Sequence, residues 1–90
     1  MTAVWKFEVP VDDSVHTLTM PAPARVVHVG CQRPGVVAVW AEVGAGSQDT
    51  AERGFRVYGT GQEVSGSYVG TAHDDGLVWH VYAEPARLAL

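Results

Sequence analysis

The residue types that most often do chemistry are few in this chain: four histidines, one cysteine and the adjacent carboxylates Asp74 and Asp75. A zinc site needs His or Cys ligands at short fixed spacings or on strands that converge. His28 and Cys31 form the closest such pair, and residues three apart on a strand point to opposite faces. We therefore predict no metal site and no cofactor. His28 and His80 are predicted to be partly buried sheet histidines that make hydrogen bonds.

Catalysis by a nucleophile requires Ser, Cys or Thr beside an oriented base, and no serine here lies in a Gly-x-Ser-x-Gly elbow. Cys31 follows a valine-rich run, which predicts a small buried hydrophobic residue. His73, Asp74 and Asp75 are predicted to form a solvated hairpin tip. One enzymatic alternative stays open, a small hydrolase or lyase that transfers protons through His80, His73 and Asp75. We favour a protein that is not an enzyme.

The most distinctive short segment is Gly59-Thr60-Gly61, which follows an aromatic residue. Two glycines allow an irregular backbone whose N–H groups could hold an anion. Tyr68-Val69-Gly70-Thr71 repeats the Gly-Thr pair about one strand later, and the two pairs could line a groove with hydroxyls. Alternatively, the glycines let Trp79 or Trp40 pack closely. The predicted ligand- or partner-binding residues are Arg56, Tyr58, Gly59, Thr60, Gly61, Gln62, Tyr68, Trp79 and His80.

The elements that must position these side chains are predicted to be strands. Valine is the commonest residue, and β-branched side chains favour pleated structure. Alternating apolar and polar residues between Gly and Pro punctuation predict seven short strands, at residues 4–9, 16–20, 25–31, 36–43, 55–58, 67–72 and 77–82. Turns are predicted at 32–35 and at Asp74-Asp75-Gly76, where Asp-Gly tolerates positive φ. The predicted fold is all-β, a small antiparallel sandwich or partly open barrel.

Ninety residues form a single domain, residues 1–90. Residues 44–54 are polar and predict a long flexible loop, and residues 86–90 predict a C-terminal tail. The net charge of −4 argues against nucleic acid and anionic membranes as partners. The apolar runs are too short to span a membrane, no signal peptide is readable, and a single cysteine suits the cytoplasm. Three tryptophans exceed what a thin core hides, so at least one is expected half-exposed at a pocket or interface.

Several segments together carry a family resemblance: Trp5-Lys6-Phe7, Phe55 to Gly61, Tyr68-Val69-Gly70-Thr71 and Leu77-Val78-Trp79-His80-Val81-Tyr82. This pattern resembles a family of small all-β proteins encoded by bacteriophages and prophages, notably of actinobacteria. In that family a histidine often follows Gly-Thr-Gly, and here Gln62 occupies that place. The resemblance implies a viral source, and the family has no established activity that could be carried over.

The leading expectation is a phage-type accessory protein that works in the host cytoplasm. It would bind a host protein or a small anionic metabolite, as a homo-oligomer that covers its exposed strand edges. The alternative from another functional class is a virion structural or decoration protein.

Overall fold

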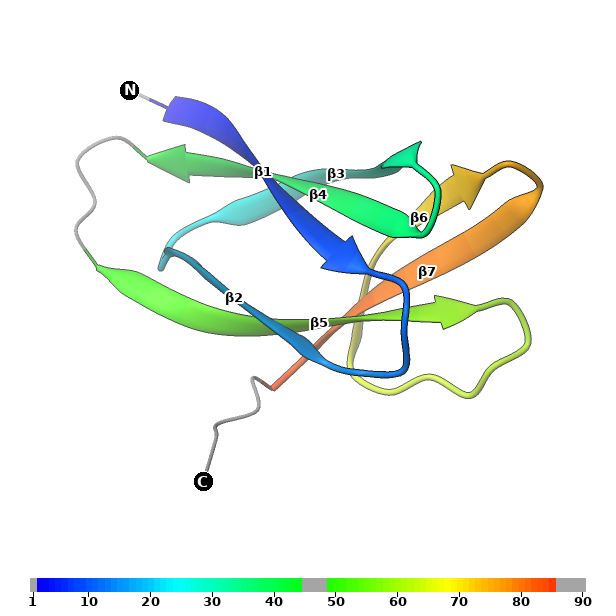
Figure 1. The fold of residues 1–90 in the computed structure, drawn as a ribbon. Helices are drawn as coiled ribbons and strands as arrows, with labels where there is room; N and C mark the ends of the chain where they lie inside the picture. Colours follow the sequence, from blue (N-terminus) through cyan, green and yellow to red (C-terminus); the bar gives the residue numbers. More distant parts are fainter. Residues whose placement is uncertain (1, 45–48, 86–90) are drawn as a thin grey trace.

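The computed structural model describes residues 2–44 and 49–85, and it is built from seven antiparallel strands (Figure 1). The strands are β1 (Thr2–Pro10), β2 (His16–Pro21), β3 (Arg25–Arg33), β4 (Val36–Gly44), β5 (Thr50–Gly59), β6 (Ser67–Asp74) and β7 (Leu77–Glu84). All seven predicted strands are confirmed, most with ends one to three residues longer. The predicted tail at 86–90 lies outside the described residues.

The strands form two sheets, one of three strands in the order β1-β4-β3 and one of four in the order β2-β5-β7-β6. The sheets face one another as an open sandwich, and β3 of the first lies against β6 of the second (Figure 1). The short connection from β1 to β2 crosses between the sheets at one end. The predicted sandwich is therefore confirmed.

The core lies between the sheets and is made by alternate residues of each strand. The largest fully buried side chains are Phe55, Met20, Val9, Val37, Val39 and Val81. Strand β6 approaches β3 closely at Gly70, where an added Cβ would lie 2.6 Å from a methyl carbon of Val29. Only glycine fits this approach, which accounts for one of the two Gly-Thr pairs as a packing device.

The predicted loop at 44–54 is wrong at its C-terminal end. Residues 50–54 belong to β5 and pair with β2, Thr50 opposite Pro21 and Gly54 opposite Thr17. Their polarity is that of a sheet surface, since Thr50 and Glu52 are exposed while alternate residues are not. Residues 45–48 of the predicted loop lie outside the described part of the chain.

Both predicted hairpin turns exist. Asp75 and Gly76 connect β6 to β7 with φ values of 43° and 87°, the double positive φ of a type I′ turn. The turn between β3 and β4 is tighter than the predicted 32–35, because β3 continues through Arg33. His28 is exposed rather than partly buried, and its ring lies 5.3 Å from that of Trp40.

Candidate functional site

The outer face of the four-stranded sheet, the side away from the core, gathers polar and aromatic side chains from three strands. We call this surface the tyrosine face; it comprises Arg56, Tyr58, Tyr68, Thr71, His80 and Tyr82. The register brings them together: Arg56 lies opposite Tyr82, Tyr58 opposite His80, and Tyr68 opposite Tyr82. A register shift between Tyr68 and Gly70 returns Tyr68 to the same face as Thr71.

Three tyrosine rings pack edge to face across this surface. The Tyr82 ring lies between the other two, 5.6 Å from Tyr58 at 89° and 5.6 Å from Tyr68 at 69°. The Arg56 guanidinium carbon lies 4.9 Å from the Tyr58 ring centre, within cation–π range. Exposure rises across the row: Tyr58 is 3% exposed and Tyr68 is 59% exposed. The row therefore has a fixed inner end and an accessible outer end.

Hydroxyl groups hold the His80 ring from both sides. Its Nε2 lies 2.9 Å from the Thr60 hydroxyl, and its Nδ1 lies 3.1 Å from the Thr71 hydroxyl. The Tyr68 hydroxyl continues this chain to Thr71 at 2.6 Å. Hydroxyls donate or accept, so the chain is satisfied with either tautomer of the imidazole. The hydrogen-bond partners of His80 are therefore the hydroxyls of Thr60 and Thr71.

Glu84 fixes the buried end of the tyrosine row. The Tyr58 hydroxyl donates to its carboxylate, and the Ser65 hydroxyl donates to the same oxygen at 2.5 Å. Hydrogen bonds to a carboxylate are stronger than those between neutral groups. The loop from Gln62 to Gly66 is thereby tied to β7 beside Tyr58.

The Gly59-Thr60-Gly61-Gln62 segment is a hydrogen-bonded turn. The Gln62 backbone N–H donates to the Gly59 carbonyl at 3.2 Å, and the Gly59 N–H donates to the Gln62 side-chain oxygen at 2.5 Å. Gly61 has φ of 96°, which suits glycine at the third position of such a turn. Of the backbone N–H groups predicted to bind an anion, that of Gly59 is therefore engaged within the turn. Gln62 closes the turn through both its backbone and its side chain.

A cleft of about 360 Å³ lies at the end of β5 and β7, next to the tyrosine face. Its lining residues are Gly59, Thr60, Gly76, Leu77, Val78 and Trp79. Trp79 belongs to the core-facing side of β7, and its ring passes 3.5 Å from the position of a Cβ on Gly59. Packing of Trp79 over glycine, one of the two alternatives, is the arrangement found. The Thr60 hydroxyl connects the cleft to His80 and so to the tyrosine face.

Asp74 is buried, against the prediction of a solvated hairpin tip. It is 8% exposed, and one carboxylate oxygen accepts the Gly35 N–H at 3.0 Å and the Trp79 indole N–H at 3.2 Å. His73 and Asp75, its neighbours in the chain, are exposed as predicted. Asp74 thus joins the β3–β4 turn to the cleft wall. No signal in the local sequence could reveal this, because Gly35 is far away in the chain.

The predicted site residues thus fall into three groups. Arg56, Tyr58, Tyr68 and His80 lie on the tyrosine face; Gly59, Thr60 and Trp79 line the cleft; Gly61 and Gln62 complete the turn between them. The prediction omitted Tyr82, Thr71, Leu77 and Glu84. The contacts of Tyr82 and Glu84 with Tyr58 depend on β5 pairing with β7, which the chain order does not reveal.

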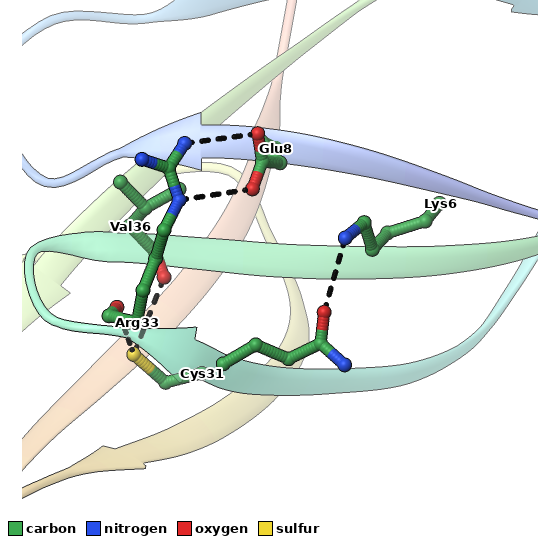
Figure 2. Close-up of polar contacts among 6 residues, drawn as sticks. Lys6, Glu8, Cys31, Arg33 and Val36 are labelled. Carbon is green, nitrogen blue, oxygen red and sulfur yellow. Dashed lines mark hydrogen bonds and ion pairs between the residues drawn. The ribbon is translucent and has the colours of Figure 1, made fainter.

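Two carboxylates far from this surface have lowered pKa values. Arg33 reaches from the end of β3 over β4 and donates to Glu8 on β1 at 3.1 and 3.3 Å, which lowers the pKa of Glu8 (Figure 2). The Ser14 N–H and the His16 ring lower the pKa of Asp12 in the β1–β2 turn. Both are surface contacts that fix turns. Across residues 2–44 and 49–85, no three His, Cys, Asp or Glu side chains form a candidate metal site.

Comparison with known families assigns the chain to one of them. A family model described as a domain of unknown function, DUF7352, matches residues 1–89. The chain belongs to the DUF7352 family. No curated protein and no solved structure matches it. The described part of this DUF7352 domain has no helix long and apolar enough to cross a membrane.

Proposed function

We propose that this DUF7352 domain is a binding module without enzymatic activity, and that its tyrosine face docks on a partner protein. The observation that carries the proposal is the packed row Tyr58–Tyr82–Tyr68, which is buried at one end and 59% exposed at the other. Tyr and Arg are enriched in protein–protein interfaces, because they supply large contact area and hydrogen bonds together.

Pre-organisation of this surface supports binding. The rings of Tyr58 and Tyr68 are held through Glu84 and Thr71, so little side-chain entropy remains to be lost on docking. The face is also formed by paired strands and not by loops, which keeps its residues in register. Such a surface favours an interface with a second rigid body.

The chemistry of the partner follows from the two ends of the surface. The cleft beside Trp79 and Leu77 accommodates an apolar side chain, and Leu77 is 54% exposed at its rim. Arg56 places a guanidinium on the tyrosine face, with its central carbon 4.9 Å from the Tyr58 ring centre. The matching partner therefore presents an apolar anchor and, beside it, a carboxylate.

A protein partner is favoured over a small anionic metabolite. The Gly59 N–H, one of the groups that an anion at this turn would use, donates to the Gln62 side chain within the turn itself. The tyrosine face is also a row of rings and not an enclosed pocket. We also propose that the protein comes from a phage or prophage and acts inside the host cell. This rests on the resemblance of its Gly-Thr-Gly and Trp-His-Val-Tyr segments to the phage-encoded family.

The test is affinity capture with three baits: the wild type, Tyr68→Ala and Val27→Ala. Val27 is 44% exposed on the other sheet and provides the matched control. The captured protein is then purified and titrated against each bait. We expect Tyr68→Ala to weaken binding by about tenfold or more, as for an interface hot spot, and Val27→Ala to leave it unchanged. Equal loss with both variants, or binding of anionic metabolites without any protein partner, would overturn the proposal.

A further inference from the structure

Strand β1 differs from the other three edge strands in being long, regular and uncovered. Strands β3 and β6 both carry register shifts and lie against each other where the sheets meet. Strand β2 has six residues and ends at a proline. In contrast, β1 pairs with β4 over nine residues without a shift, and no strand of the described chain pairs with its other side. Natural sheets normally protect such an edge, so this one requires an occupant.

The backbone groups that β1 turns outward can be assigned from one hydrogen bond. The Val11 N–H donates to the Gly35 carbonyl at 3.0 Å and continues the β1–β4 register by one pair. Odd-numbered residues of β1 therefore exchange hydrogen bonds with β4, and even-numbered residues point their N–H and C=O groups away. Pro10 fits this assignment, since its missing N–H falls on the free side. The free edge carries the N–H groups of Thr2, Val4, Lys6 and Glu8.

The charged side chains of β1 do not block the pairing of another strand with this edge. Lys6 donates to the Gln32 side chain at 3.0 Å and Glu8 accepts from Arg33, so both reach back across β4 toward β3 (Figure 2). Apolar side chains remain in their place: Val4 is 56% exposed and Trp5 is 50% exposed. They lie on opposite faces of β1, so both faces of the edge are apolar near its middle.

We propose that β1 pairs antiparallel with β1 of a second copy of this chain, centred on Trp5. The two three-stranded sheets then join into one continuous sheet across a two-fold axis. Trp5 lies opposite Trp5 of the second copy, Val4 opposite Lys6, and Thr2 opposite Glu8. All four outward N–H groups of each copy meet a carbonyl of the other. This interface lies apart from the tyrosine face and does not depend on the proposed function.

The neighbouring registers are less favourable. Centring on Lys6 sets two lysines directly opposite each other, which is destabilising. Centring on Phe7 leaves Thr2 outside the pairing and sets Pro10, which has no N–H, opposite Val4. Of these three registers, the Trp5-centred one avoids both costs and pairs all four outward N–H groups of each copy.

Disulfide trapping reads out this register directly. In a Cys31→Ser background, the variants Trp5→Cys, Lys6→Cys and Phe7→Cys are oxidised separately and run on a non-reducing gel. At Trp5 the two Cα atoms face each other in a non-hydrogen-bonded pair about 4.5 Å apart, within reach of a disulfide. At Lys6 and Phe7 the equivalent atoms are beyond about 7 Å, which is too far. We expect a covalent dimer from Trp5→Cys alone; trapping mainly through Lys6 or Phe7 would overturn the register.

A second variant tests the interface without a cross-link. Val4→Pro removes one outward N–H and leaves the β4 hydrogen bonds intact. Thr17→Pro is the control. The Ala22 N–H donates to the Asp49 carbonyl, so even-numbered residues of β2 bond to β5 and the N–H of Thr17 points to the free side of β2. Sedimentation equilibrium should show a wild-type and Thr17→Pro dimer and a Val4→Pro monomer. The Tyr68→Ala variant should form the dimer as the wild type does. A wild type that stays monomeric, without disulfide trapping in any cysteine variant, would overturn the proposal.

Discussion

Removing the Asp74 carboxylate should destabilise the fold far more than changing its neighbour Asp75. Asp74 is 8% exposed and accepts two hydrogen bonds, from the Gly35 backbone and the Trp79 indole. A hydrogen bond to a charged group contributes about 1.5–3 kcal/mol, and a buried donor left without an acceptor carries a similar penalty. Gly35 is exposed, so water replaces part of its lost bond. We therefore expect Asp74→Ala to lower the free energy of unfolding by about 2–3 kcal/mol.

The assay is urea denaturation followed by tryptophan fluorescence, with the m-value checked for two-state behaviour. In a domain of this size such a loss lowers Tm by about 10–20 °C. Asp74→Asn keeps an acceptor oxygen and should lose about 1 kcal/mol. Asp75→Asn preserves a residue that tolerates positive φ and should stay within about 0.5 kcal/mol of the wild type. If Asp74→Ala and Asp75→Asn were equally mild, the tie between Asp74, the β3–β4 turn and Trp79 would be refuted.

Three further predictions concern packing and charge. Gly70→Ala should lower the free energy of unfolding by about 1–3 kcal/mol, because the added Cβ would lie 2.6 Å from a methyl carbon of Val29. In a double-mutant cycle, Val29→Ala should recover part of that loss. Strictly additive effects of the two substitutions would contradict the close approach. Trp79→Phe keeps a ring over Gly59 but loses the bond to Asp74, so unfolding in urea should show a loss of about 1–2 kcal/mol, and a neutral result would count against that bond. The Arg33 hydrogen bond holds the pKa of Glu8 below its ordinary 4.5, so its small stabilisation is present above about pH 4.5 and is lost as the pH falls through the lower folded value. Stability measured between about pH 5 and 3 should therefore fall less in Glu8→Gln than in the wild type, and parallel curves would contradict this contact.

The strands were predictable because the alternation of side chains is a local property. Trp5, Phe7 and Val9 share one face in the sequence pattern, and in the structure Val9 is fully buried while Trp5 is half-exposed at the uncovered end. The Asp-Gly hairpin was predictable for a similar reason, since positive φ is a preference of the residues themselves. The expectation that at least one tryptophan is half-exposed is confirmed by Trp5.

The errors arose where a residue's environment depends on distant pairing. Residues 50–54 are polar because one side faces solvent, and only their register with β2 makes them a strand. Arg53 shows the same effect, since its guanidinium donates to the Ala24 carbonyl at 2.8 Å. The tyrosine face likewise requires β5 and β6 to flank β7, an order that the alternation of residues does not specify. Tyr82 and Glu84 were therefore missed although both lie in or next to a predicted strand.

We propose the tyrosine face as the surface on which a partner protein docks. The most direct measurement is site-specific photo-crosslinking, with a photoreactive phenylalanine analogue placed at Tyr68 or, on the other sheet, at Val27. We expect an adduct with the partner from the analogue at position 68 and none from the analogue at position 27. An adduct from Val27 alone would contradict it.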